Sequence, residues 1–161
     1  MRVAVGFDHA GYPLKRTVVP LLEQAGHEVI DCGTDSEDSV DYPVHAARAA
    51  RLVASGEADR AVLGCGTGAG MSIVANKFEG VRAVNAREVE DAELARRHND
   101  ANVLALAGRR MGAGDVSRIV EVFLETGFDG GRHQRRVDQI SRIEEGSAPE
   151  VPEASTVEKR G

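Results

Sequence analysis

A cysteine inside a glycine-rich segment is the strongest chemical feature of the sequence. The segment GCGTGAG spans residues 64–70 and follows the apolar run 60–63 directly. Its glycines, which include Gly66, Gly68 and Gly70, let backbone N–H groups approach a ligand closely. These N–H groups, together with the N-terminus of the helix expected next, favour negative charge, either on a phosphate or on a developing oxyanion. The segment is no dinucleotide fingerprint, because glycine occupies every second position, and no P-loop, because no Gly-Lys-Ser/Thr ending follows.

Cys65 is expected at the end of a strand, with its sulfur facing a ligand crevice. A helix N-terminus beside it would favour the thiolate, which acts as a base or as a nucleophile. The alternative is a small residue that packs beneath the loop, because free cysteines are commonly buried. The residues themselves leave both interpretations open.

Two histidine motifs are further candidates for chemistry. Asp8 and His9 end the first expected strand, at the edge where Cys65 is expected. His98 and Asn99 precede the fifth. Isolated pairs of this kind often only cap or buttress turns, so spacing alone assigns them no chemistry.

Cationic side chains gather near the C-terminal end of the chain. Arg109 follows the fifth expected strand, and Arg132 and Arg136 are four residues apart, on one face of an expected helix. Two guanidinium groups on one face suit a phosphate dianion. The alternative is a solvated helix face that pairs with acidic residues elsewhere.

The elements that would position these residues alternate along the chain. Helices are expected from Pro13 to Gly26 and at 43–54, 71–76, 88–97, about 116–124 and after Gly131, and strands at 2–5, 28–31, 60–63, 81–84 and 102–106. This alternation predicts an α/β fold, a doubly wound parallel sheet of about five strands with helices on both faces. Such folds bind ligands beyond the carboxyl ends of the strands.

Length and composition exclude several classes. The 161 residues suit one domain, expected over 1–145, and the Pro-, Ser- and Glu-containing stretch 146–161 is expected to be a disordered tail. A net charge of −6 and the absence of Trp argue against nucleic-acid binding. No apolar run is long enough to span a bilayer, no secretory signal is visible, and two cysteines make no disulfide framework, so a cytoplasmic protein is expected.

Five motifs in register resemble the ribose-5-phosphate isomerase B family, which also includes galactose-6-phosphate isomerase subunits and allose-6-phosphate isomerases. They are GFDHAG at 6–11, DYP at 41–43, GCGTGAGMSIVANK at 64–77, RRHNDANVLALAGR at 96–109 and GGRHQRRV at 130–137. The resemblance covers Met1 to about Glu145. It implies a Rossmann-like fold, no metal or cofactor, and a homodimer, or a pair of dimers, with active sites between subunits.

The resemblance also implies an activity: aldose–ketose isomerisation of a small phosphorylated sugar by proton transfer between C1 and C2, through a cis-enediolate. Ribose 5-phosphate to ribulose 5-phosphate is the first expectation. A second branch of the family carries a glutamate base where this chain has Met71, so the chain follows the cysteine branch, with Cys65 as the base.

The resemblance implies further roles. The N–H groups of Gly66 to Gly70 would stabilise the oxyanion, and His98, assisted by Thr67, would open the sugar ring. Sugar hydroxyls and reacting oxygens would be held by Asp8 and Asn99, and the phosphate by His9, Arg109, Arg132 and Arg136. Three of these residues would reach in from the partner subunit: His98, Asn99 and Arg109.

Other functions remain as alternatives. Phe7, beside Asp8, could narrow the pocket and favour a tetrose phosphate such as erythrulose 4-phosphate, and a hexose 6-phosphate is a further candidate. A cysteine hydrolase would use Cys65 as the nucleophile, together with a histidine. A non-catalytic module would bind a phosphorylated ligand without chemistry.

Overall fold

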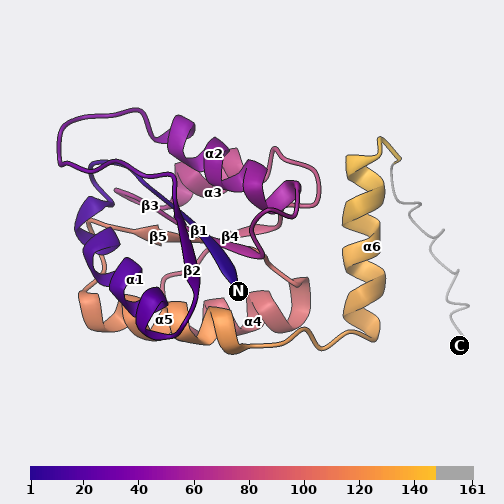
Figure 1. Cartoon of the computed structure of the whole chain (residues 1–161). Coiled ribbons are helices and arrows are strands. Elements are labelled where there is room, and N and C mark those ends of the chain that lie inside the picture. Colours follow the sequence, from indigo (N-terminus) through magenta and orange to yellow (C-terminus); the bar gives the residue numbers. More distant parts are fainter. Residues whose placement is uncertain (148–161) are drawn as a thin grey trace, which may run out of the picture.

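The chain forms a five-stranded, fully parallel sheet in the order β2-β1-β3-β5-β4, with helices on both faces (Figure 1). The computed structural model describes residues 1–147. The strands are β1 (Arg2–Phe7), β2 (Glu28–Asp31), β3 (Arg60–Cys65), β4 (Ala83–Asn85) and β5 (Val103–Ala107). The helices are α1 (Tyr12–Gln24), α2 (Tyr42–Ala54), α3 (Ala69–Ala75), α4 (Val89–Asn99), α5 (Ala113–Glu125) and α6 (Arg132–Glu144). The predicted fold class is confirmed.

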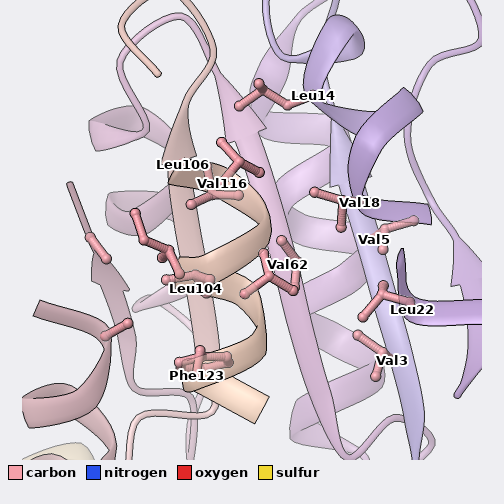
Figure 2. Close-up of a cluster of buried hydrophobic side chains, with 14 of the residues drawn as sticks. Val3, Val5, Leu14, Val18, Leu22, Val62, Leu104, Leu106, Val116 and Phe123 are labelled. Carbon is pink, nitrogen blue, oxygen red and sulfur yellow. The ribbon is translucent and has the colours of Figure 1, made fainter. Parts of the chain in front are cut away.

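The sheet buries a different set of side chains on each face. On one face, α1, α4 and α5 cover a cluster of branched and aromatic side chains, several of which are labelled in Figure 2 (Val3, Val5, Val18, Val62, Leu104 and Phe123). On the other face, α2 and α3 cover a cluster rich in alanine that includes Ala46, Ala49, Leu63 and Met71. Burial on both faces explains why the strands are continuous apolar runs in the sequence.

The strand order places a crevice at the carboxyl ends of β1 and β3. The chain leaves β1 toward β2 on one side and later returns to β3 on the other, so the turns that follow β1 and β3 diverge. The third strand was expected to end at Leu63. It continues through Gly64 and Cys65, because those residues pair with Phe7 in β1 and Ala107 in β5. Cys65 is therefore the last residue of a central strand.

The turn after β1 is packed against the ends of β3 and β5, backbone against backbone. A Cβ atom on Gly11 would lie 2.3 Å from the carbonyl oxygen of Gly64, and one on Gly108 would lie 2.3 Å from that of Ala10. No side chain fits at either position. These two glycines let three segments that carry functional residues approach one another.

Helix α6 stands at the side of the molecule, beyond α4 and β4 (Figure 1). It ends in a Schellman motif, in which Gly146 has a φ of +82° and the N–H of Ser147 donates to the carbonyl of Arg142. The first two residues of the expected tail, 146 and 147, therefore close this helix. The rest of the expected tail, 148–161, lies outside the described residues. Across residues 1–147, no helix is both long and apolar enough to cross a membrane.

The close contact of Gly11 with Gly64 should make a larger residue at position 11 destabilising. Gly11→Ala should lower the free energy of unfolding by about 1–3 kcal/mol, because the added methyl overlaps the backbone of Gly64. Gly114→Ala is the matched control: a Cβ there meets nothing within 4 Å, and alanine favours the helix by up to about 1 kcal/mol. Urea unfolding of both variants measures the difference. Equal stability of the two variants would contradict the close packing.

Candidate active site

A pocket of about 330 Å³ lies at the carboxyl edge of the sheet. Its volume suits a small metabolite. Three turns line it, those that follow β1, β3 and β5, together with the start of α2. The lining residues are Asp8, His9, Ala10, Tyr42, Cys65, Gly66, Thr67, Gly70 and Arg109. The structure thus brings together most of the residues that the sequence placed at the crevice.

Cys65 is 6% exposed, and it lines this pocket. Its side chain also belongs to the apolar cluster under α2 and α3, so the two sequence interpretations are each partly correct. The backbone N–H of Gly68 donates to Sγ at 3.2 Å, and a φ of +76° at Gly68 turns the chain into α3. A hydrogen bond donated to sulfur stabilises negative charge on it.

The second cysteine has a different environment. Burial, followed by the neighbouring Asp31 carboxylate, raises the pKa of the Cys32 thiol. Its nearest hydrogen-bond partner is a carbonyl, that of Ile30, 3.9 Å from Sγ. Cys32 is therefore held as a thiol at neutral pH, and it lies outside the pocket that Cys65 lines.

Asp8 and His9 are held by backbone groups. One carboxylate oxygen of Asp8, Oδ1, accepts hydrogen bonds from the N–H groups of Ala10 and Gly11, at 2.9 and 2.8 Å. Both bonds use the same oxygen, which leaves the other as an acceptor for a ligand. The ring of His9 accepts a hydrogen bond at Nδ1 from the N–H of Val40, at 3.2 Å.

Arg109 lies in the pocket of its own chain. Its backbone N–H donates to the carbonyl of Gly66 at 3.2 Å, and a Cβ on Gly66 would lie 3.4 Å from its side-chain Cδ. The expectation that Arg109 reaches in from a partner subunit is therefore wrong, because the short turn after β5 already places it beside Cys65. The pocket thus contains a positive charge supplied from within.

Two residues without a predicted role shape the glycine segment. The ring of Tyr42 covers Gly70, where a Cβ would lie 2.7 Å from ring atoms. The amide nitrogen of Asn85 donates to the carbonyl of Thr67 at 3.1 Å. The tyrosine stands in the DYP motif at 41–43, which was the available signal; no spacing in the sequence indicates that Asn85 lies beside Thr67.

The remaining predicted residues lie at the opposite edge of the sheet. His98 and Asn99 end α4, which runs back toward the amino ends of the strands, and Arg132 and Arg136 lie on the first turns of α6 beside it. The rings of His98 and His133 stack in parallel, with centroids 4.3 Å apart. One chain does not bring this group to Cys65.

An ion-pair cluster around Asp100 fixes the end of α4, directly after His98 and Asn99 in the chain. Asp100 has a φ of +46°, the left-handed conformation that ends the helix, and its carboxylate accepts from Arg82 and Arg96 at 2.9 and 2.8 Å. Arg96 is buried and also donates to the carbonyl of Ala101. The acidic residue of the His-Asn-Asp motif thus forms ion pairs that fix the end of α4.

The cluster of His98, His133, Arg132 and Arg136 is suited to bind an anion. Burial, then His98, Arg132 and Arg136, lower the pKa of His133, so its ring is neutral at neutral pH. His98, Asp129 and His133 place possible metal ligands within 4.8 Å of one another, but the Asp129 carboxylate already pairs with Arg97 at 3.2 Å. The surrounding cations oppose a metal ion and favour a negatively charged ligand.

Phe7 does not narrow the pocket. Its side chain is fully buried in the cluster under α1 and α5, and its ring lies against Gly64, where a Cβ would be 2.4 Å from Cδ1. Alternation along β1 turns Phe7 into the core and leaves Asp8 at the pocket. The structural argument for a tetrose substrate is therefore removed.

A parallel α/β fold with a cysteine and an arginine in one pocket at the carboxyl edge of its sheet is typical of enzymes that act on small molecules. The family model of ribose/galactose isomerases matches residues 3–140. Ribose-5-phosphate isomerase B of Escherichia coli is 48% identical over 144 residues, which cover 89% of this chain and 97% of that protein. The chain belongs to the ribose/galactose isomerase family, and it is an aldose–ketose isomerase.

Solved structures agree with this assignment. The ribose-5-phosphate isomerase B of Clostridium thermocellum superposes with a TM-score of 0.89 at 46% identity, over 91% of this chain and 99% of that one. The enzyme of Mycoplasma genitalium, with bound ribulose-5-phosphate, superposes with a TM-score of 0.87 at 37% identity, over 91% and 97%. The Rossmann-like doubly wound architecture is therefore that of known members of the family.

The two thiols should differ in reactivity. Iodoacetamide at pH 7 should modify Cys65 at least roughly tenfold faster than Cys32, because burial and Asp31 keep Cys32 protonated whereas Cys65 lines an open pocket and accepts a donated N–H. Peptide mapping by mass spectrometry over a time course measures both rates. Faster modification of Cys32 would contradict this assignment of the reactive sulfur.

Proposed function

We propose that the chain interconverts ribose 5-phosphate and ribulose 5-phosphate. The observation that carries the proposal is that the Cys65 sulfur, held by the N–H of Gly68, shares one pocket with His9 and Arg109. That combination offers a proton acceptor beside groups that bind a phosphate. The names of the relatives at 48% and 46% identity support the same substrate.

In this mechanism the thiolate of Cys65 removes a proton from C2 of the open-chain aldose, and the thiol returns it to C1, while the hydroxyl proton on O2 passes to O1. Negative charge develops on the sugar oxygen in the cis-enediolate, where the main-chain N–H groups of residues 66–70 act as donors. Asp8 binds sugar hydroxyls through the carboxylate oxygen that its own turn leaves free. Because main-chain dipoles stabilise the charge, the proposal includes no metal or cofactor.

In this proposal a second chain completes the site with the residues at the opposite edge of its sheet, which are His98, Asn99, Arg132 and Arg136. His98 opens the furanose ring with the help of Thr67, and Asn99 contacts the reacting oxygens. Since Arg132 and Arg136 share the corner of His98, we expect them to enter with it and to bind the phosphate with His9 and Arg109. A homodimer that pairs the two edges in this way, alone or within a tetramer, supplies every predicted residue.

Other substrates rank lower in this proposal. Tetrose phosphates lose the argument from Phe7, and a hexose 6-phosphate has no observation in its favour. Cytoplasmic localisation stays a prediction from the sequence. A turnover assay with four-, five- and six-carbon sugar phosphates ranks the substrates, and we expect ribose 5-phosphate to have the highest kcat/KM.

Replacement of the proposed base should abolish most activity. Cys65→Ser should lower kcat by about 10²–10⁴-fold, because a serine hydroxyl hardly ionises at neutral pH. Cys32→Ser is the matched control, and its kcat should stay within about twofold of the wild type because Cys32 lies outside the pocket. Comparable losses in the two variants would argue against a specific role for Cys65.

Solvent deuterium exchange at C2 of ribose 5-phosphate separates the proposal from its alternatives. An isomerase incorporates deuterium through Cys65, whereas a binding module leaves that proton in place. A cysteine hydrolase would instead show a covalent adduct on the sulfur by mass spectrometry. Binding of ribose 5-phosphate by the wild type without any exchange or turnover would overturn the proposed function.

A mixing experiment tests the shared site. Cys65→Ser and His98→Asn should each be inactive on ribose 5-phosphate, but an equimolar mixture refolded together should recover about a quarter of the wild-type activity, since half of random dimers contain one intact site of two. The control is a mixture of two variants that both replace Cys65, because no dimer formed from them contains an intact site. No recovery in the first mixture would place both residues in a site built by one chain.

A further inference from the structure

Lys15, on the first turn of α1, is buried although it carries a charge. It is 7% exposed, and its Nζ donates to the carbonyl of Thr34 at 2.8 Å and to the carboxylate of Asp35 at 2.9 Å. An ion pair with Asp31, at 2.6 Å, completes its partners. A buried ammonium is retained only when it is paired, and here the partners belong to the end of β2 and to the segment 32–41 that follows it.

The far end of the same segment contacts the pocket. Val40, one residue before the N-cap of α2, donates its N–H to Nδ1 of His9 at 3.2 Å. His9 and Lys15 belong to one corner of the chain, because the N–H of Lys15 donates to the carbonyl of Gly11 and the Asp8 carboxylate accepts the N–H of Gly11. Two sets of contacts therefore hold the segment 32–41 against the chain between β1 and the first turn of α1. Lys15 makes the first set, and the hydrogen bond from Val40 to His9 is the second.

The hydrogen bond from Val40 selects one form of the His9 ring. A backbone N–H can only donate, so Nδ1 must accept and carries no proton. The neutral ring then has its proton on Nε2, and a proton added to Nδ1 would remove the bond to Val40. His9 lines the pocket together with Arg109, so an Nε2–H donor and a guanidinium line the same pocket.

We propose that Lys15 is a positioning residue for substrate binding. By fastening the segment 32–41 to α1, it keeps Val40 in place, and Val40 keeps His9 as an Nε2–H donor to the phosphate. The identity of the anion as a sugar phosphate rests on the proposed function. The form of the His9 ring and its dependence on Lys15 rest on the hydrogen bonds alone.

Nitrogen-15 NMR of the histidine rings, with His9 assigned by a His9→Asn variant, tests the proposal together with kinetics. Wild-type His9 should show an unprotonated Nδ1 and a protonated Nε2. In Lys15→Met the His9 signals should move toward a mixture of tautomers, and KM for ribose 5-phosphate should rise about tenfold with kcat within about twofold, the pattern of lost binding. Lys77→Met, which removes an exposed lysine, should change neither.

Two results would overturn the proposal: a protonated Nδ1 in wild-type His9, or a folded Lys15→Met variant with unchanged His9 signals and KM. If Lys15→Met does not fold, Asp35→Asn, which removes one exposed partner, should shift the same signals to a smaller extent, and unchanged signals would equally count against it. Titration with inorganic phosphate repeats the binding measurement without turnover. An inactive wild type whose His9 behaves as expected would refute the proposed function and leave the role of Lys15 standing.

Discussion

The close approach of three backbone turns is the constraint on which the site depends. Gly11 lies against the carbonyl of Gly64, and Gly108 lies against that of Ala10, so the turn after β1 touches the end of β3 and the turn after β5 without intervening side chains. Cys65 is the last residue of β3, and Asp8, His9 and Arg109 follow β1 or β5 by at most two residues. Their convergence is therefore a direct result of backbone packing at the edge of a parallel sheet, and the flexible parts of the side chains contribute little to it.

The same parallel topology explains why the functional residues form two groups. Each helix returns the chain to the amino ends of the strands, so residues at the end of α4 and on the adjacent start of α6 gather at the opposite edge from the pocket. There the ion pairs of Asp100 and the stacked rings of His98 and His133 form a second cluster of side chains. The division gives a physical reason to expect a site assembled from two chains, which the fold of one chain does not complete.

Much of the fold could be predicted because its signals are local. Apolar runs in β1, β3 and β5 and helical spacing in α1 and α5 place these elements to within a few residues, and the motifs place Asp8, His9 and Cys65 at one edge. What failed depended on neighbours far apart in the sequence. Phe7 points into the core because of its place in the pleat, Arg109 lies in its own chain's pocket, and Lys15 and Asn85 acquire roles only through contacts with distant segments.

The hydrogen bond from Gly68 to the sulfur comes from the main chain, and this has a consequence for inheritance. A point mutation can exchange a side chain, but it cannot delete an amide that every residue other than proline possesses. Variation during evolution can therefore displace this donor or tilt it, and it changes the chemistry only through the path of the backbone. An engineer who wishes to alter the range of accepted molecules should leave the segment 66–70 alone and vary the side chains that line the pocket, such as the partly exposed Tyr42.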